Sequence, residues 1–205
     1  MLRFISKNAL LLGTAAVLCV AVVAGVNQLT ADEIAKQALA QKLASLQQVL
    51  PAGASSDGLL DSCRRVQQPD MFGANSVPVY TVKHQDQTIY IVETVAPDGY
   101  SGNISLLVAV GSDGTVYGVR TLAHKETPGL GDKIELAKSS WILSFAGKNA
   151  SAPTFSVKKD GGEFDQFAGA TITPRAVVNA TKRAALFFQQ HPEQFAQSAA
   201  CGASS

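Results

Sequence analysis

The segment ISLLVAVGSDGTVYGVRT, residues 104–121, contains two runs rich in aliphatic and β-branched residues on either side of the turn 111–114. The Asp-Gly pair in this turn tolerates the positive φ angles that tight hairpins require. The runs 104–110 and 115–121 are therefore predicted to be paired antiparallel strands. Every second residue of the first run is a large aliphatic, which is typical of a strand with one face on a core.

Two more strands are predicted before this hairpin, at residues 77–83 and 88–96, because both runs are rich in β-branched residues. Helical patterns occur on both sides of these strands in the sequence. A mainly antiparallel sheet with flanking helices is an α+β arrangement, and this is the fold class that the sequence predicts.

Two helices are predicted after the sheet. Over residues 132–146 the apolar positions recur near helical spacing, and Asp132 and Glu135 have the spacing of an N-terminal capping box. The last helix is predicted over residues 174–190. Thr173 precedes it as a preferred N-cap residue, and its first residue is proline, which is favoured at that position.

The N-terminal part is predicted to be a transmembrane helix. From Asn8 to Ala31 there are 24 residues without Lys, Arg, Asp or Glu, which as a helix would span roughly 36 Å against a hydrocarbon core of roughly 30 Å. Arg3 and Lys7 precede this run, so the N-terminus is expected in the cytoplasm and the remainder outside. A cleaved signal peptide is the alternative, which the length of the run disfavours.

A separate helix is predicted over residues 30–50, because Thr30 and Glu33 have the capping-box spacing and Pro51 would end the helix. The loop 52–58 follows. The predicted organisation is a cytoplasmic N-terminus and anchor at 1–29, a helical connector and loop at 30–58, and an exported domain at 59–205.

Composition excludes several classes of protein. The 205 residues are 46% hydrophobic, with 17 basic and 16 acidic side chains, which is unlike a disordered chain or a nucleic-acid-binding surface.

Cys63 and Cys201 would both lie in an oxidising compartment and are predicted to form a disulfide. The three histidines lack metal-ligand spacing, and no P-loop, nucleophile elbow or dinucleotide fingerprint is present. No metal site and no catalytic residue is predicted.

Two loops are candidates for binding a nucleotide. Residues 165–175, DQFAGATITPR, bring hydroxyl groups to a helix N-terminus, where free N–H groups favour a phosphate and Arg175 adds positive charge. Gly169 and Ala170 would leave Thr171 accessible. On this segment alone, an ordinary capped helix is the stronger interpretation.

Residues 126–133, ETPGLGDK, form the second glycine-rich loop that opens a helix. Gly129 and Gly131 would let the main chain approach a flat ring closely. Two such loops can hold the two ends of one nucleotide, although a pair of merely structural turns is the alternative.

Together with Asp98-Gly99-Tyr100-Ser101-Gly102, these two loops resemble, in order and spacing, the G subunit of the bacterial Rnf (Rsx) electron-transport complex. That family is related to the C subunit of the sodium-pumping NADH:quinone oxidoreductase. The resemblance extends over essentially the whole chain. It implies that a flavin transferase attaches FMN by a phosphoester to the threonine of the motif Asp-x-x-Ser/Thr-Gly-Ala-Thr.

In this chain the motif begins at Asp165 and ends at Thr171, which makes Thr171 the expected attachment residue. Ala168 replaces the Ser or Thr of the motif. The cofactor-binding residues predicted from the loops and the resemblance are Tyr100, Ser101, Gly102, Thr127, Pro128, Gly129, Leu130, Gly131, Lys133, Asp165, Gly169, Ala170, Thr171, Thr173 and Arg175.

The resemblance further implies an electron-carrier subunit of an oxidoreductase that couples electron transfer between ferredoxin and NAD to ion translocation across the bacterial inner membrane. Its FMN-binding domain would be periplasmic, and its partners would be the other membrane and peripheral subunits and the lipid bilayer. It would not be an autonomous enzyme. Two alternatives remain open: a non-redox scaffold whose flavin motif has decayed, as Ala168 suggests, and an independent flavin reductase.

Overall fold

The computed structural model describes residues 2–68, 72, 76–85 and 87–201 of the chain. Its internal contacts divide the chain into two compact units, on either side of the bond between Ala44 and Ser45. The second of them, residues 45–205, is called the C-terminal unit.

The first unit consists of helix α1 (Leu2–Gln47) as far as Ala44, and the helix is long and apolar enough over Ala9–Gln47 to cross a membrane. Large aliphatic side chains from Leu10 to Val26 are exposed, as expected of a lipid-facing anchor. The helix predicted over residues 30–50 is confirmed as far as Gln47, but it does not begin at Thr30. The Thr30 hydroxyl donates to the carbonyl of Val26 at 2.8 Å, as threonine does inside a helix, so it caps nothing and the helix is continuous.

The C-terminal unit is built on a seven-stranded sheet in the order β6-β5-β4-β3-β2-β1-β7, with every pair antiparallel. The strands are β1 (Arg64–Val66), β2 (Val77–His84), β3 (Gln87–Ala96), β4 (Ile104–Gly111), β5 (Thr115–Ala123), β6 (Lys148–Asn149) and β7 (Ala199–Ala200). The four predicted strands are confirmed, each within two residues at either end. The three short strands were not predicted.

A disulfide joins Cys63, which precedes β1, to Cys201, which follows β7. The two Cα atoms are 5.4 Å apart, and the Cys201 N–H also donates to the Cys63 carbonyl at 3.1 Å. The bridge therefore fastens the end of the chain to the edge of the sheet.

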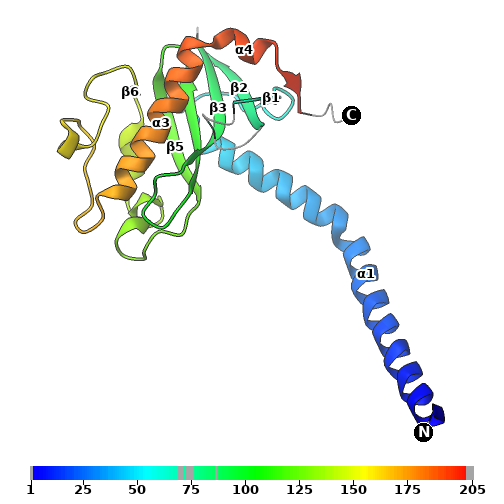
Figure 1. Cartoon of the computed structure of the whole chain (residues 1–205). Helices are drawn as coiled ribbons and strands as arrows, with labels where there is room; N and C mark the ends of the chain where they lie inside the picture. Colours follow the sequence, from blue (N-terminus) through cyan, green and yellow to red (C-terminus); the bar gives the residue numbers. More distant parts are fainter. Residues whose placement is uncertain (1, 69–71, 73–75, 86, 202–205) are drawn as a thin grey trace. The chain divides into compact units, whose positions relative to one another are not determined.

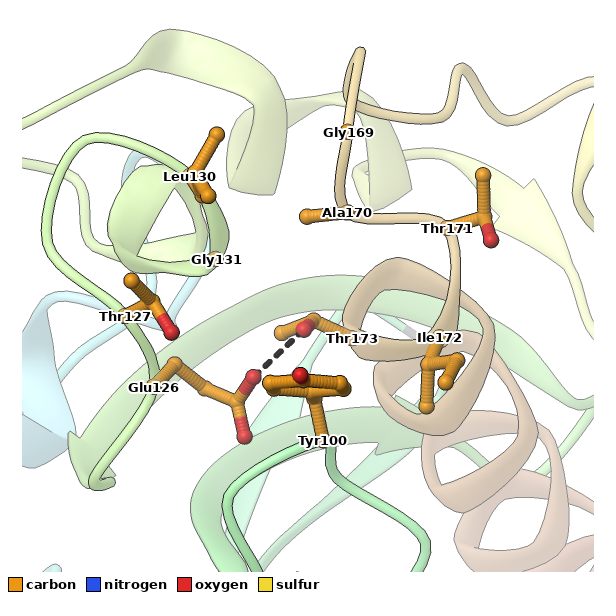
Figure 2. Close-up of a pocket in the computed structure, with 10 residues that line it drawn as sticks. All are labelled: Tyr100, Glu126, Thr127, Leu130, Gly131, Gly169, Ala170, Thr171, Ile172 and Thr173. Atoms are coloured by element: carbon orange, nitrogen blue, oxygen red, sulfur yellow. Dashed lines mark hydrogen bonds between the residues drawn. The ribbon is translucent and has the colours of Figure 1, made fainter.

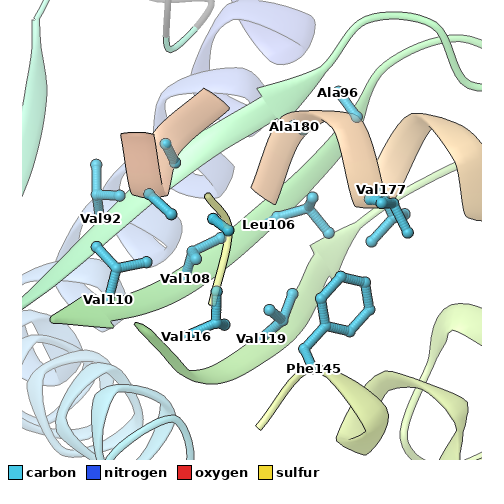
Figure 3. Close-up of a cluster of buried hydrophobic side chains, with 14 of the residues drawn as sticks. Val92, Ala96, Leu106, Val108, Val110, Val116, Val119, Phe145, Val177 and Ala180 are labelled. Atoms are coloured by element: carbon cyan, nitrogen blue, oxygen red, sulfur yellow. The ribbon is translucent and has the colours of Figure 1, made fainter. Parts of the chain in front are cut away.

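Two helices pack near the sheet, α3 (Ile172–Gln190) and the short α4 (Pro192–Ala196). Figure 1 shows α3 lying across one face of the sheet. Its buried face includes Val177 and Ala180, and Figure 3 shows Val177 between the helix and Phe145. The alternating aliphatic side chains of β4, from Ile104 to Val110, form the sheet's side of this core.

The opposite face of the sheet is covered by the first residues of the C-terminal unit, from 45 to 59. A Cβ atom on Gly118 of β5 would lie 2.5 Å from the carbonyl oxygen of Val49, so the main chain of this segment contacts the strand directly. Leu46, Val49 and Leu59 are almost fully buried. Both faces of the sheet are thus shielded from solvent.

The predicted helix 132–146 is wrong. Two 3-10 helices take its place, η1 (Gly131–Ile134) and η2 (Ser140–Phe145), and a third, η3 (Lys158–Asp160), follows. Glu135 was expected to cap the helix, but its carboxylate contacts His124 Nε2 at 2.6 Å. The Ser139 hydroxyl accepts from the Trp141 N–H and begins η2 separately.

The predicted start of the last helix is also wrong by two residues. Helix α3 begins at Ile172, with Thr171 in the N-cap position. Thr173 is not the N-cap, because it lies inside the first turn with its side chain fully buried. This shift decides which hydroxyl of the loop is exposed.

Candidate functional site

A pocket of about 310 Å³ opens between three segments of the C-terminal unit (Figure 2). They are the turn after β3, the loop after β5 and the start of α3. The volume is at the lower end of the range of small-molecule sites, roughly 300–1,000 Å³. The lining residues are Tyr100, Glu126, Thr127, Leu130, Gly131, Gly169, Ala170, Thr171, Ile172 and Thr173.

A tight turn brings Thr171 to the pocket. The Ala170 N–H donates to the Phe167 carbonyl at 3.1 Å, and Gly169, third in the turn, has φ +80°. A positive φ at this position is typical of a type II turn and favours glycine. Ala168, the second residue of the turn, is exposed.

Aromatic packing fixes the base of this turn. Phe167 is buried and packs edge to face on Trp141, with ring centroids 5.1 Å apart. The Trp141 indole N–H donates to the main-chain carbonyl of Asp165 at 2.8 Å. The start of the motif is therefore held at the core while residues 168–171 stay at the surface.

The hydroxyl of Thr171 is accessible. The residue is exposed, and its side chain makes no capping hydrogen bond to α3. Within the part of the chain that the structure describes, Thr171 Oγ1 has no hydrogen-bond partner. The first N–H groups of a helix have no partner within the helix and carry the positive end of its dipole, so a phosphate on this hydroxyl would be stabilised.

The hydroxyl of Thr173 has the opposite environment. Thr173 has no exposed surface, and its Oγ1 donates to Glu126 Oε2 at 2.5 Å. Glu126 is 4% exposed, and its Oε1 accepts from the Ser101 N–H at 2.9 Å. The Glu126 carboxylate therefore joins the three segments that surround the pocket.

Two glycines leave room for this carboxylate. A Cβ on Gly131 would lie 2.9 Å from Glu126 Oε2 and 3.1 Å from Thr173 Oγ1, and a Cβ on Gly99 would lie 2.9 Å from Glu126 Oε1. The Gly131 N–H is already donated to the Thr127 carbonyl at 3.0 Å. The sequence predicted that Gly131 admits a ring, whereas in the structure it also makes space for Glu126.

Three large side chains at the pocket are exposed although they are apolar or aromatic: Tyr100 is 69%, Leu130 42% and Ile172 44% exposed. In Figure 2 they stand on different sides of the opening. Flat and aliphatic surfaces around a small cavity are what a planar aromatic ligand requires.

Arg175 was predicted to face a phosphate, but the structure directs it elsewhere. Its guanidinium makes two hydrogen bonds to the Asp160 carboxylate, at 2.6 and 2.7 Å. This pairing raises the pKa of Arg175 and lowers the pKa of Asp160. The Asp165 carboxylate is likewise paired, with Lys158 at 2.5 Å.

The pocket thus brings together eight of the predicted binding residues: Tyr100, Thr127, Leu130, Gly131, Gly169, Ala170, Thr171 and Thr173. The predicted residues that do not line it are Ser101, Gly102, Pro128, Gly129, Lys133, Asp165 and Arg175. Glu126 and Ile172 line the pocket but were not predicted. No group of three His, Cys, Asp or Glu side chains that could hold a metal ion occurs among the described residues.

Comparison with known proteins adds independent findings. Residues 99–186 match the FMN-binding domain, and residues 1–49 match the RnfG N-terminal region. The chain is 50% identical over 206 residues to the G subunit of the ion-translocating oxidoreductase complex of Escherichia coli O157:H7, covering 98% of this chain and 100% of that protein. The protein of the same name from Shewanella loihica is 47% identical, with 94% of this chain and 93% of that protein covered.

The fold also occurs in a solved structure. The crystal structure of the C subunit of the Na(+)-translocating NADH-quinone reductase from Parabacteroides distasonis matches 79% of this chain and 96% of its own, with a TM-score of 0.50 and 23% identity. This likeness supports the antiparallel sheet with flanking helices described above.

Proposed function

The chain belongs to the family of G subunits of ion-translocating oxidoreductase complexes, and we propose that it is a membrane-anchored electron carrier with FMN bound covalently to Thr171. The observation that carries this proposal is the accessible Thr171 hydroxyl, without a hydrogen-bond partner among the described residues, at the mouth of a pocket in the FMN-binding domain.

The proposed bond is a phosphoester. It forms when Thr171 Oγ1 displaces a leaving group from the flavin-bearing phosphorus of an activated donor, with loss of the hydroxyl proton, and a flavin transferase carries out this step. Because Arg175 is paired with Asp160, the charge that stabilises the phosphate comes from the start of α3. The helix has three rather than four unpaired N–H groups there, since Pro174 has none.

The residues present fit the flavin ring as well. Tyr100, Leu130 and Ile172 offer flat or aliphatic surfaces, and Gly169 and Gly131 also line the cavity. FMN, when bound, supplies one- and two-electron transfer, while the protein positions the ring and adjusts its electrostatic surroundings. Attachment through the phosphate keeps the cofactor from dissociating, which suits an electron relay.

In the proposed topology, residues 1–29 contain the membrane anchor, residues 30–58 the helical connector and residues 59–205 the FMN-binding domain. Arg3 and Lys7 favour a cytoplasmic N-terminus. The Cys63–Cys201 disulfide supports a periplasmic location for the domain, because such bonds persist in oxidising compartments. Electrons would pass between ferredoxin and NAD through the partner subunits, coupled to ion translocation across the inner membrane.

The proposal is tested by producing the full chain together with a flavin transferase and reading flavin fluorescence from the denatured protein band. Wild type and Thr173→Val are expected to be fluorescent, because the Thr173 hydroxyl is buried and bonded to Glu126 and is not the proposed acceptor. Thr171→Val is expected to lose the signal completely. Fluorescence that survives Thr171→Val, or disappears in Thr173→Val alone, would contradict attachment at Thr171.

A further inference from the structure

We propose that Glu126 lowers the reduction potential of the bound flavin by keeping a negative charge at the wall of the pocket. This inference rests on the proposed function, since it concerns FMN attached at Thr171. Glu126 lines the pocket and is 4% exposed. Figure 2 shows its carboxylate on the pocket wall beside the Tyr100 ring, facing Thr173.

The carboxylate has little freedom to move away. Each of its oxygens accepts one hydrogen bond, from the Ser101 N–H at 2.9 Å and from the Thr173 hydroxyl at 2.5 Å. The main chain at Gly99 and Gly131 comes so close that a Cβ on either would lie 2.9 Å from a Glu126 oxygen. The charge is therefore fixed in place at the pocket.

No basic side chain balances this charge at the pocket. Among the described residues that line it, none is Lys, Arg or His. Lys125, the nearest cation in sequence, is exposed. His124 accepts the Glu126 N–H through Nδ1 and contacts Glu135 through Nε2, so both of its ring nitrogens are engaged away from the carboxylate. The two donors that compensate Glu126, an amide and a hydroxyl, are neutral.

A fixed negative charge opposes reduction, because reduction adds negative charge to the flavin. Two like charges repel more strongly in a partly dehydrated pocket than in bulk water. The oxidised flavin is thus favoured relative to the reduced one, and the potential falls. A lower potential makes the reduced flavin a stronger electron donor to the next carrier.

The substitution Glu126→Gln removes the charge of the side chain and keeps its shape. The glutamine amide oxygen can accept from the Ser101 N–H, as the carboxylate does. Its amide nitrogen can donate to the Thr173 hydroxyl, which reverses the direction of that hydrogen bond but keeps the contact. Glu163→Gln is the matched control. It removes the same charge from a glutamate that pairs with Lys148 and lies outside the pocket lining.

The test is a redox titration of the full chain with FMN attached, monitored by flavin absorbance. In Glu126→Gln the ratio of reduced to oxidised flavin at a fixed potential should rise at least tenfold, which for a two-electron couple is a positive shift of about 30 mV. Glu163→Gln should change the ratio by less than about threefold, or about 15 mV. An unshifted or lowered potential in Glu126→Gln, or an equal shift in the control, overturns the inference.

A second variant covers the case in which Glu126→Gln does not fold. Thr173→Val keeps the carboxylate but removes one of its two donors, so the charge of Glu126 is less compensated and the potential should fall. An unchanged or raised potential in this variant overturns the inference.

Mass analysis before each titration separates the two claims. Protein that carries no FMN on Thr171 overturns the proposed function and this inference with it. FMN on Thr171 together with an unshifted potential in Glu126→Gln overturns this inference alone.

Discussion

Thr171 and Thr173 lie two residues apart at the start of α3, and their hydroxyl groups lie on opposite sides of the helix. Thr171 is exposed and makes no capping bond, whereas Thr173 is fully buried and donates to Glu126. Two helical steps rotate a side chain by about 200°. The loop therefore leaves the hydroxyl of Thr171 exposed and buries that of Thr173 against Glu126.

Gly131→Ala should lower the stability of the protein more than a substitution at Gly129. Its Cβ would lie 2.9 Å from Glu126 and 3.1 Å from the Thr173 hydroxyl, so the variant should lose about 1–3 kcal/mol of stability. Gly129→Asn is the control, because nothing lies within 4 Å of the added Cβ and asparagine tolerates the φ of +77°. Urea unfolding of both variants measures this, and a larger loss for Gly129→Asn would contradict it.

The Cys63–Cys201 bridge should stabilise the C-terminal unit substantially. It spans 138 residues of sequence, for which chain entropy gives a stabilisation of up to about 5 kcal/mol. Thermal unfolding of Cys63→Ser/Cys201→Ser should occur at a clearly lower temperature than that of wild type, and reductant should affect wild type alone. Cys19→Ser, which alters the unpaired cysteine in α1, should unfold like wild type.

Asp113 in the β4–β5 turn should contribute to stability only above acidic pH. Partial burial raises its pKa, but hydrogen bonds from the Thr115 N–H and hydroxyl and from Gln87 lower it, and the net pKa lies below its ordinary value of 3.8. The folded state thus binds fewer protons than the unfolded state, and the contribution is lost as pH falls below 3.8.

The corresponding measurement compares urea midpoints of wild type and Asp113→Asn at several pH values. Wild type should be the more stable protein by a constant margin at neutral pH, and the margin should shrink below pH 3.8. A margin that grows on acidification would show that the carboxylate is destabilised by folding.

Ala168→Ser restores the motif residue that this chain lacks. Ala168 is exposed in the turn and does not line the pocket, so the substitution should change stability by no more than about 0.5 kcal/mol. If the motif side chain faces the transferase during attachment, Ala168→Ser should acquire FMN faster than wild type while the flavin potential stays the same. A time course of flavin fluorescence after mixing with the transferase measures the rate, and equal rates would contradict this role.

Local sequence was sufficient to predict the long strands because alternation and turn residues are properties of neighbouring positions. Strands β1 and β7 contain three and two residues, and they pair beside the disulfide between Cys63 and Cys201. No local sequence pattern predicts the pairing of these two distant segments. Likewise, the 3-10 turn at η1 follows from the Thr127 carbonyl, which accepts from three successive N–H groups instead of allowing an α-helix to begin.

The candidate site was predictable where main-chain chemistry defines it. Glycine and threonine residues in the two loops indicate tight turns before a helix. Most residues that line the pocket belong to these two loops. Glu126 was missed because the burial of an acid depends on glycines from other segments, Gly99 among them. The pairing of Arg175 with Asp160 was not predicted, because Asp160 comes from a different loop, at η3.

Attachment of FMN at Thr171 is tested most directly by peptide mass spectrometry of the full chain purified from membranes of cells that contain the flavin transferase. The peptide containing Thr171 and Thr173 should be heavier by one esterified FMN, and fragmentation should assign the added mass to Thr171. An unmodified peptide, or an added mass on Thr173 or on another segment, would contradict it.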